Sequence, residues 1–97
     1  MRIIAKKALR DFWGRHPDAE GPLLAWYREA EAESWDSPAK VKQKYGSASI
    51  VANNRVVFNI KGNTYRLVVK VNYGVRIVFI RFVGTHAEYD RINVEDI

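Results

Sequence analysis

In the first half of the chain, apolar residues recur every three or four positions, the spacing of one helix face. This pattern predicts an amphipathic helix over residues 5–15, which ends at His16 because a residue before proline is disfavoured in the helical region. Asp18 is the predicted cap of a second helix, with Pro22 in the first turn, where amides have no intrahelical partner. The two apolar faces consist of Ile4, Ala8, Leu9, Phe12 and Trp13, and of Leu23, Trp26, Tyr27 and Ala30.

The pattern then changes from helical to alternating. A third short helix is predicted from Ser37 to about Tyr45, because serine caps helices and Pro38 suits the first helical position. After it, apolar and polar residues alternate as in strands, in three runs separated by turn residues. The runs are residues 55–60, 65–72 and 76–83. Residues 1–4 fit either an edge strand or the entry to the first helix.

This order of elements predicts an α+β domain, with N-terminal helices packed on one face of a small antiparallel meander. The other sheet face is expected to be open to solvent and ligand. A length of 97 residues suits one domain spanning 1–97. Charge interrupts the N-terminal residues too soon for a secretory signal, and no apolar run is long enough to cross a bilayer. We therefore expect a cytoplasmic protein without a membrane partner.

Basic residues dominate the second half of the chain. No Asp or Glu occurs between Asp36 and Glu88, and residues 40–97 carry ten Lys or Arg against four acids. This asymmetry indicates either an anionic partner or a solvated basic face without a specific role. The basic residues of the acid-free stretch are Lys40, Lys42, Lys44, Arg55, Lys61, Arg66, Lys70, Arg76 and Arg81.

The acid-free stretch ends in a dense titratable cluster, residues 85–90. Thr85 followed by Glu88 matches a capping box, so the cluster is explained in part as the start of a short C-terminal helix. The functional alternative places His86 at the first helical position, which favours phosphate and a neutral imidazole that can act as a base. Tyr89 and Asp90 would share its helical face.

Arg66 and Arg81 form a second candidate constellation. If the hairpin turn centres on Tyr73 and Gly74, Arg66 faces Arg81, and two like charges would indicate an anion between them. A shift of one residue would place the two arginines on opposite faces. Spacing alone leaves independent solvated arginines as the alternative. Lys61, in the preceding turn, could equally contact phosphate or be solvated.

Several other chemistries lack their residues. The chain has two histidines and no cysteine, which excludes disulfides, thiolate nucleophiles and cysteine zinc sites. No cluster with metal-ligand spacing, phosphate loop, dinucleotide fingerprint or serine nucleophile elbow is recognisable. We therefore expect neither a metal nor a cofactor.

Two stretches resemble a known family. They are residues 54–69, NRVVFNIKGNTYRLVV, and residues 78–90, VFIRFVGTHAEYD. Together they closely resemble the HigB toxins of type II toxin–antitoxin systems, within the RelE-like superfamily. The resemblance implies a RelE-like fold and a metal-independent endoribonuclease that cuts messenger RNA on translating ribosomes. It also implies a HigA-type helix-turn-helix antitoxin that neutralises the toxin, with operator DNA bound only through the toxin–antitoxin complex.

By this resemblance, His86 corresponds to the essential histidine, while Arg66, Arg81, Lys61 and Tyr89 lie at positions suited to phosphate binding and support. RNA carries its own nucleophile, the 2′-hydroxyl, so we expect His86 to act as general base. Arg81 and Arg66 would stabilise the phosphorane, and Tyr89 or Lys61 would assist the leaving oxygen. The residues expected to bind RNA are Lys61, Arg55, Lys70 and Arg76.

Two alternatives remain open from the sequence. The first is a non-catalytic RNA- or ribosome-binding module that uses the same basic sheet, with salt-dependent binding and no cleavage. The second is an interaction subunit whose basic face docks an acidic protein.

Overall fold

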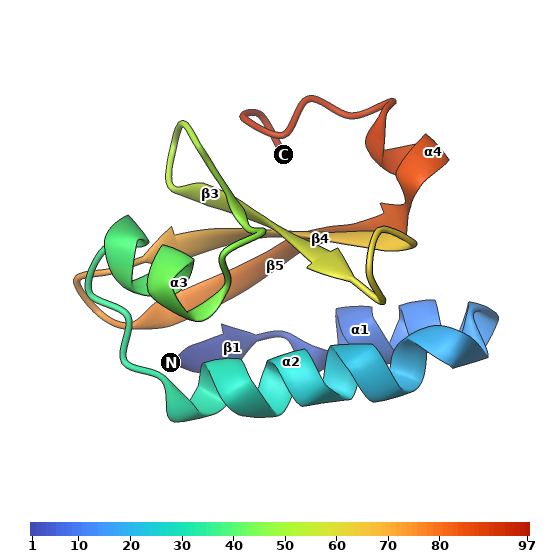
Figure 1. Ribbon diagram of the computed structural model, residues 1–97, viewed down its shortest axis with the longest axis horizontal. Helices are drawn as coiled ribbons and strands as arrows, with labels where there is room; N and C mark the ends of the chain where they lie inside the picture. Colours follow the sequence, from blue (N-terminus) through green and yellow to red (C-terminus); the bar gives the residue numbers. More distant parts are fainter.

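Helices and strands follow one another in the predicted order in the computed structural model, which describes all residues 1–97 (Figure 1). The helices are α1 (Lys6–Arg15), a 3-10 turn η1 (Pro17–Ala19), α2 (Glu20–Ala32), α3 (Pro38–Lys44) and α4 (His86–Tyr89). The strands are β1 (Arg2–Ile4), β2 (Ser49–Val51), β3 (Arg55–Ile60), β4 (Tyr65–Asn72) and β5 (Ile77–Thr85). No helix combines the length and apolar character needed to cross a membrane.

The five strands form one sheet in the order β1-β5-β4-β3-β2. The antiparallel meander β3-β4-β5 is the predicted one. Residues 2–4 are an edge strand, parallel to β5, which decides between the two alternatives for the N-terminal residues. Strand β2, which pairs antiparallel with β3, was not predicted, because three residues are too few for an alternating pattern to register.

Helices α1 and α2 lie side by side against one face of the sheet (Figure 1). The inward positions of β3 and β4 are the alternating apolar residues that the sequence indicated, and they pack against the apolar helix faces. The expected α+β class is therefore confirmed. The main core residues are Leu9, Phe12, Leu23, Trp26, Trp35, Val41, Val56, Phe58, Ile60, Leu67, Val69, Val71 and Val78.

The opposite sheet face is not open as predicted. Val57 and Val68, whose positions alternate away from the helices, are both buried. The C-terminal residues 90–97 run along this side of the sheet (Figure 1). Arg55 is only 8 % exposed, and its guanidinium donates to the main-chain oxygens of Asn53 and Ile97. The valines at outward positions were the signal that this face is partly covered.

The β4–β5 register differs from the one that would pair Arg66 with Arg81. Residues 73–76 separate the two strands, so the hairpin does not turn tightly at Tyr73 and Gly74. Arg66 lies opposite Gly84. A β-bulge follows along the ladder, where Val68 pairs with Phe82 but Val69 pairs with Ile80, which leaves Arg81 without an opposite residue. The longer turn and the bulge together separate the two arginines.

Candidate active site

Helix α4 begins with the capping box that the sequence predicted. The Thr85 hydroxyl accepts a hydrogen bond from the Glu88 amide at 3.2 Å, and the Thr85 amide donates to the Glu88 carboxylate at 2.8 Å. These bonds hold the pKa of Glu88 below its ordinary value. They also fix the point where β5 becomes α4, so His86 stands at the first helical position at the end of the sheet.

His86 is backed by a carboxylate on its own helix. The Nδ1 atom of His86 lies 3.3 Å from Oδ2 of Asp90, one helical turn on, and the His86 side chain is 55 % exposed. A carboxylate can only accept, so this contact favours the tautomer that carries the proton on Nδ1. The Nε2 lone pair is then available to take a proton from a ligand. Sequence spacing predicted this shared face, and the structure confirms it.

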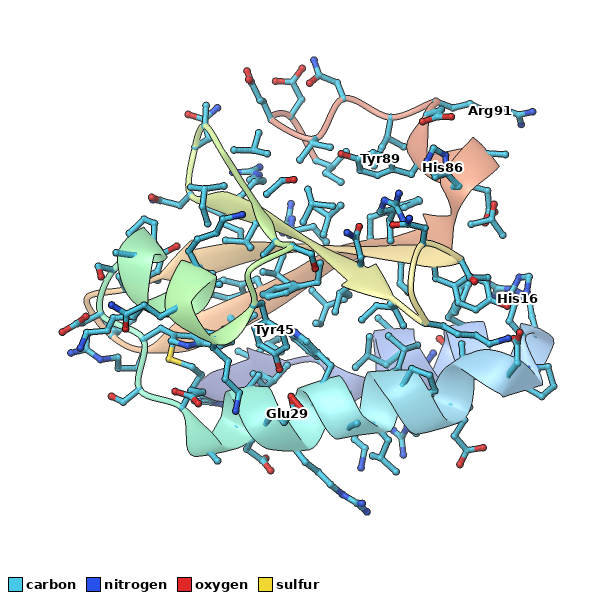
Figure 2. All side chains as sticks on the ribbon, viewed as in Figure 1. His16, Glu29, Tyr45, His86, Tyr89 and Arg91 are labelled. Atoms are coloured by element: carbon cyan, nitrogen blue, oxygen red, sulfur yellow. The ribbon has the colours of Figure 1, made fainter.

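Arg66 contacts Tyr89, which lies on the same helix as His86 (Figure 2). Its guanidinium carbon is 5.9 Å from the centre of the Tyr89 ring, which is a cation–π contact. Nη1 of Arg66 also donates to the Asn63 carbonyl at 3.0 Å. Because Arg66 lies opposite Gly84, it comes to the end of the sheet where α4 starts. A base, a phenol and a guanidinium therefore share this end of the molecule.

Lys61 lies at the same end but already has a partner. Its ammonium is 2.8 Å from Asp18, whose carboxylate also accepts a hydrogen bond from the Tyr65 hydroxyl. The expected role of Asp18 as the cap of α2 is wrong, since Ala19 holds that position and no side chain caps the helix. The carboxylate instead ties η1 to the β3–β4 turn, because a cation and a phenol lie within its reach.

Replacing Asp18 with Asn is expected to reduce thermal stability at neutral pH but not in strong acid. The hydrogen bonds from Lys61 and Tyr65 lower the pKa of Asp18, so its stabilising effect is complete above the unfolded-state value. That effect disappears as the pH falls through the folded-state pKa, below about pH 4. Thermal unfolding at pH 7 and pH 2.5 checks this. An unchanged gap between the two proteins at both pH values would contradict it.

The other predicted basic residues are spread over the sheet. Arg81 is exposed at the bulge, and Lys70 is exposed in the middle of β4. Arg76 donates to Ser34 and to the Tyr73 carbonyl at the opposite end of β5, which is roughly 30 Å from His86 by strand rise. Together with the buried Arg55, Arg76 has donors engaged within the chain. The structure therefore brings Arg66 to Tyr89 on the helix of His86, whereas Lys61 is paired with Asp18 and these two arginines are engaged elsewhere.

His16, which the sequence marks only as the end of the first helix, follows α1 and has aromatic neighbours in the fold. Its ring stacks on Phe12 with centroids 4.4 Å apart and packs edge-to-face with Tyr65. Tyr65, which the ring of His16 contacts, pairs across the sheet with Thr85, the residue before α4. Both histidines appear at the same end of the molecule in Figure 2. No sequence motif pointed to His16, because its neighbours come from distant segments.

Two other features lie outside this cluster. A cavity of about 140 Å³ lies between α2 and β3, lined by Trp26, Phe58 and others, with Lys61 as the only lining residue from the cluster described above. At its rim the Tyr45 hydroxyl donates to Glu29 at 2.7 Å, and burial raises the pKa of Tyr45 (Figure 2). The chain places no group of three or more His, Cys, Asp or Glu side chains where they could hold a metal ion.

Known proteins are similar in sequence to this chain over most of its length. Residues 19–92 match the HigB toxin family, described as the RelE-like toxic component of a toxin-antitoxin system. The mRNA interferase toxin HigB of Escherichia coli strain K12 is 30% identical over 92 residues, which cover 93% of this chain and 88% of that protein. The mRNA interferase HigB of Shigella flexneri gives the same figures. An mRNA interferase HigB of Escherichia coli O6:H1 is 22% identical over 94 residues, 95% of this chain and 91% of that protein. The chain belongs to the HigB family of RelE-like toxins.

Proposed function

We propose that this chain is a toxin whose single domain, residues 1–97, is an mRNA endoribonuclease that inhibits translation and growth. Its HigB relatives are named mRNA interferases and match nearly the whole chain. The observation that carries the proposal is His86, exposed at the end of the sheet, with Asp90 at its Nδ1 atom and Arg66 against Tyr89 of the same helix. A base and a cation of this kind suit cleavage of RNA by its own 2′-hydroxyl.

The proposed reaction is an in-line transesterification. Nε2 of His86 takes the proton of the 2′-hydroxyl, and the 2′-oxygen then attacks the adjacent phosphorus. The bond from phosphorus to the 5′-oxygen breaks, and the 5′-oxygen takes a proton, for which the Tyr89 hydroxyl and the Lys61 ammonium are the candidate donors. The products are a 2′,3′-cyclic phosphate and a 5′-hydroxyl. Neither step requires a metal-bound water, so the reaction is proposed to be metal-independent.

Cationic groups would stabilise the charge that develops on the phosphorane. Arg66 is the proposed cation, because its guanidinium contacts Tyr89 on the same helix as His86. Preorganised donors of this kind stabilise the transition state because they need no reorganisation during the reaction. Arg81 and Lys70 are exposed and can contact the RNA backbone, whereas the buried Arg55 and the engaged Arg76 are left out of the proposed contact surface.

The proposed partners follow from membership of the family. The substrate is messenger RNA on the ribosome in the cytoplasm, and the inhibitor is a HigA-type helix-turn-helix antitoxin. Operator DNA is bound only through the toxin–antitoxin complex. The net charge of +5 favours anionic partners such as RNA.

Induction of this chain alone is expected to arrest growth, and the purified protein is expected to cleave mRNA in translating ribosome complexes. The fragments should carry 5′-hydroxyl ends and 2′,3′-cyclic phosphate, or the 3′-phosphate formed by its hydrolysis, as attack by the 2′-hydroxyl requires. Fragments with 5′-phosphate ends would contradict the mechanism.

Salt-dependent binding without any cleavage would favour the non-catalytic RNA-binding module instead. Equal cleavage of free mRNA would contradict ribosome dependence.

A further inference from the structure

The His16 ring is held flat on the protein surface by buried aromatic residues. It stacks on Phe12 with an interplanar angle of 22° and packs edge-to-face with Tyr65 at a centroid distance of 5.5 Å. Phe12 is 1% exposed and Tyr65 is 5% exposed, so both are part of the core. His16 itself is partly exposed. Because Phe12 covers one face of the imidazole, only the face that points away from Phe12 is left for a ligand to stack on.

This ring lies beside the candidate active site. Tyr65, which the ring touches, is paired across the sheet with Thr85, the residue directly before His86. The exposed Arg15 adds a cation next to His16, with its guanidinium carbon 5.9 Å from the same Phe12 ring. The contact of His16 with Tyr65 and the pairing of Tyr65 with Thr85 therefore link the stacked imidazole to the start of α4.

We propose that the exposed face of His16 is a stacking platform for a nucleobase next to the scissile phosphate, with Arg15 available to the adjoining RNA backbone. The inference rests on the proposed RNA-cleaving function and adds a substrate-binding subsite to it. Single-stranded RNA is commonly held by stacking its splayed bases on aromatic or histidine rings. Phe12 and Tyr65 cannot serve, because the core covers them, whereas His16 presents a ring already fixed in orientation.

Stacking of a nucleobase requires a flat ring at position 16 but does not require that the ring can give or take a proton. His16→Phe keeps a flat ring that can stack on Phe12 and on a base, whereas His16→Ala removes the platform. If His16 instead acted as an acid or base, both variants would lose the same function. The pair therefore separates stacking from proton transfer, and the phenylalanine variant also preserves the packing against Phe12.

The test measures binding of an unstructured, fluorescently labelled RNA 12-mer to protein carrying His86→Ala, which prevents cleavage. Adding His16→Ala is expected to weaken binding roughly 5- to 150-fold, the range for loss of one base–aromatic stack. Adding His16→Phe is expected to keep the affinity within about threefold. Val75→Ala, at an exposed position in the turn at the other end of the sheet, serves as the control and should leave binding unchanged. Thermal unfolding of each variant checks that the fold is retained.

Equal affinity of the alanine and parent proteins would overturn the proposal, as would an equal loss in the alanine and phenylalanine variants. Failure of the parent protein to bind the oligonucleotide would also overturn it, since a platform built from this chain does not need the ribosome. Cleavage by the wild-type protein is measured separately. Absence of cleavage together with stacking-dependent binding would refute the proposed function but not the platform.

Discussion

Replacement of His86 with alanine is expected to lower mRNA cleavage by roughly 10²–10⁴-fold, the usual contribution of a general base. The fold should remain intact, because the side chain is 55 % exposed and its hydrogen-bonding contact is with Asp90. The bonds that start α4 are made by Thr85 and Glu88 and do not involve the imidazole. Single-turnover cleavage of ribosome-bound mRNA, compared with thermal unfolding of both proteins, measures the two effects separately.

The matched control for His86 is Asp90→Asn, which keeps an acceptor for the Nδ1 proton but removes the charge. We expect a smaller loss of activity than for His86→Ala, together with a shifted pH–rate profile, because the carboxylate orients the ring and stabilises the imidazolium that forms. Wild-type activity in His86→Ala would rule out the proposed base. Loss of activity that accompanies unfolding would instead show that the residue is structural.

Replacement of Arg66 with alanine is expected to lower kcat by about 10²–10³-fold, as for removal of one donor to a developing oxyanion. The guanidinium contacts Tyr89 and main-chain carbonyls at the surface, so the sheet should tolerate its loss. Arg66→Lys keeps the charge without the planar fork and should restore only part of the rate. Steady-state kinetics on ribosome-bound mRNA separates kcat from KM.

Arg2→Ala is the control for Arg66, because it removes the same charge from the opposite end of the sheet. Arg2 is exposed on β1 and pairs with Ile77 at the start of β5. Its replacement should leave kcat unchanged. If Arg66→Ala raised KM and left kcat intact, the arginine would bind substrate and transition state equally, which contradicts its assigned part in catalysis.

The local features of this fold could be predicted because each depends on neighbours in the sequence. The spacing of apolar residues predicted α1 and the β3-β4-β5 meander. The capping pair of Thr85 and Glu88 predicted the start of α4. The capping and catalytic interpretations of residues 85–90 also proved compatible. One set of residues makes the cap, while His86, Tyr89 and Asp90 keep their side chains for other contacts.

The features that could not be predicted depend on distant parts of the chain. The bulge at Arg81 adjusts the register of two long strands, and no local pattern marks where the extra residue falls. Asp18 is a residue type that commonly caps helices. Its carboxylate instead accepts hydrogen bonds from Lys61 and Tyr65, which the β3–β4 turn brings together. The sequence predicts Arg55 as an RNA-binding residue, whereas in the fold its guanidinium donates to the main-chain oxygen of Ile97 in the C-terminal segment. His16 acquired its stacked orientation from Phe12 and Tyr65 in the same way.

The pairing of β1 with β5 has a consequence for the order of events during synthesis. Arg2 pairs with Ile77, roughly 75 residues later, and such non-local pairings must await the arrival of the second strand. Domains of this size fold as units while synthesis proceeds at about 5–20 residues per second. The sheet end that carries His86 also depends on β5, which follows all the other strands in the sequence. Under the proposed function, the cleavage site is therefore complete only after β5 has been synthesised and has paired with β4.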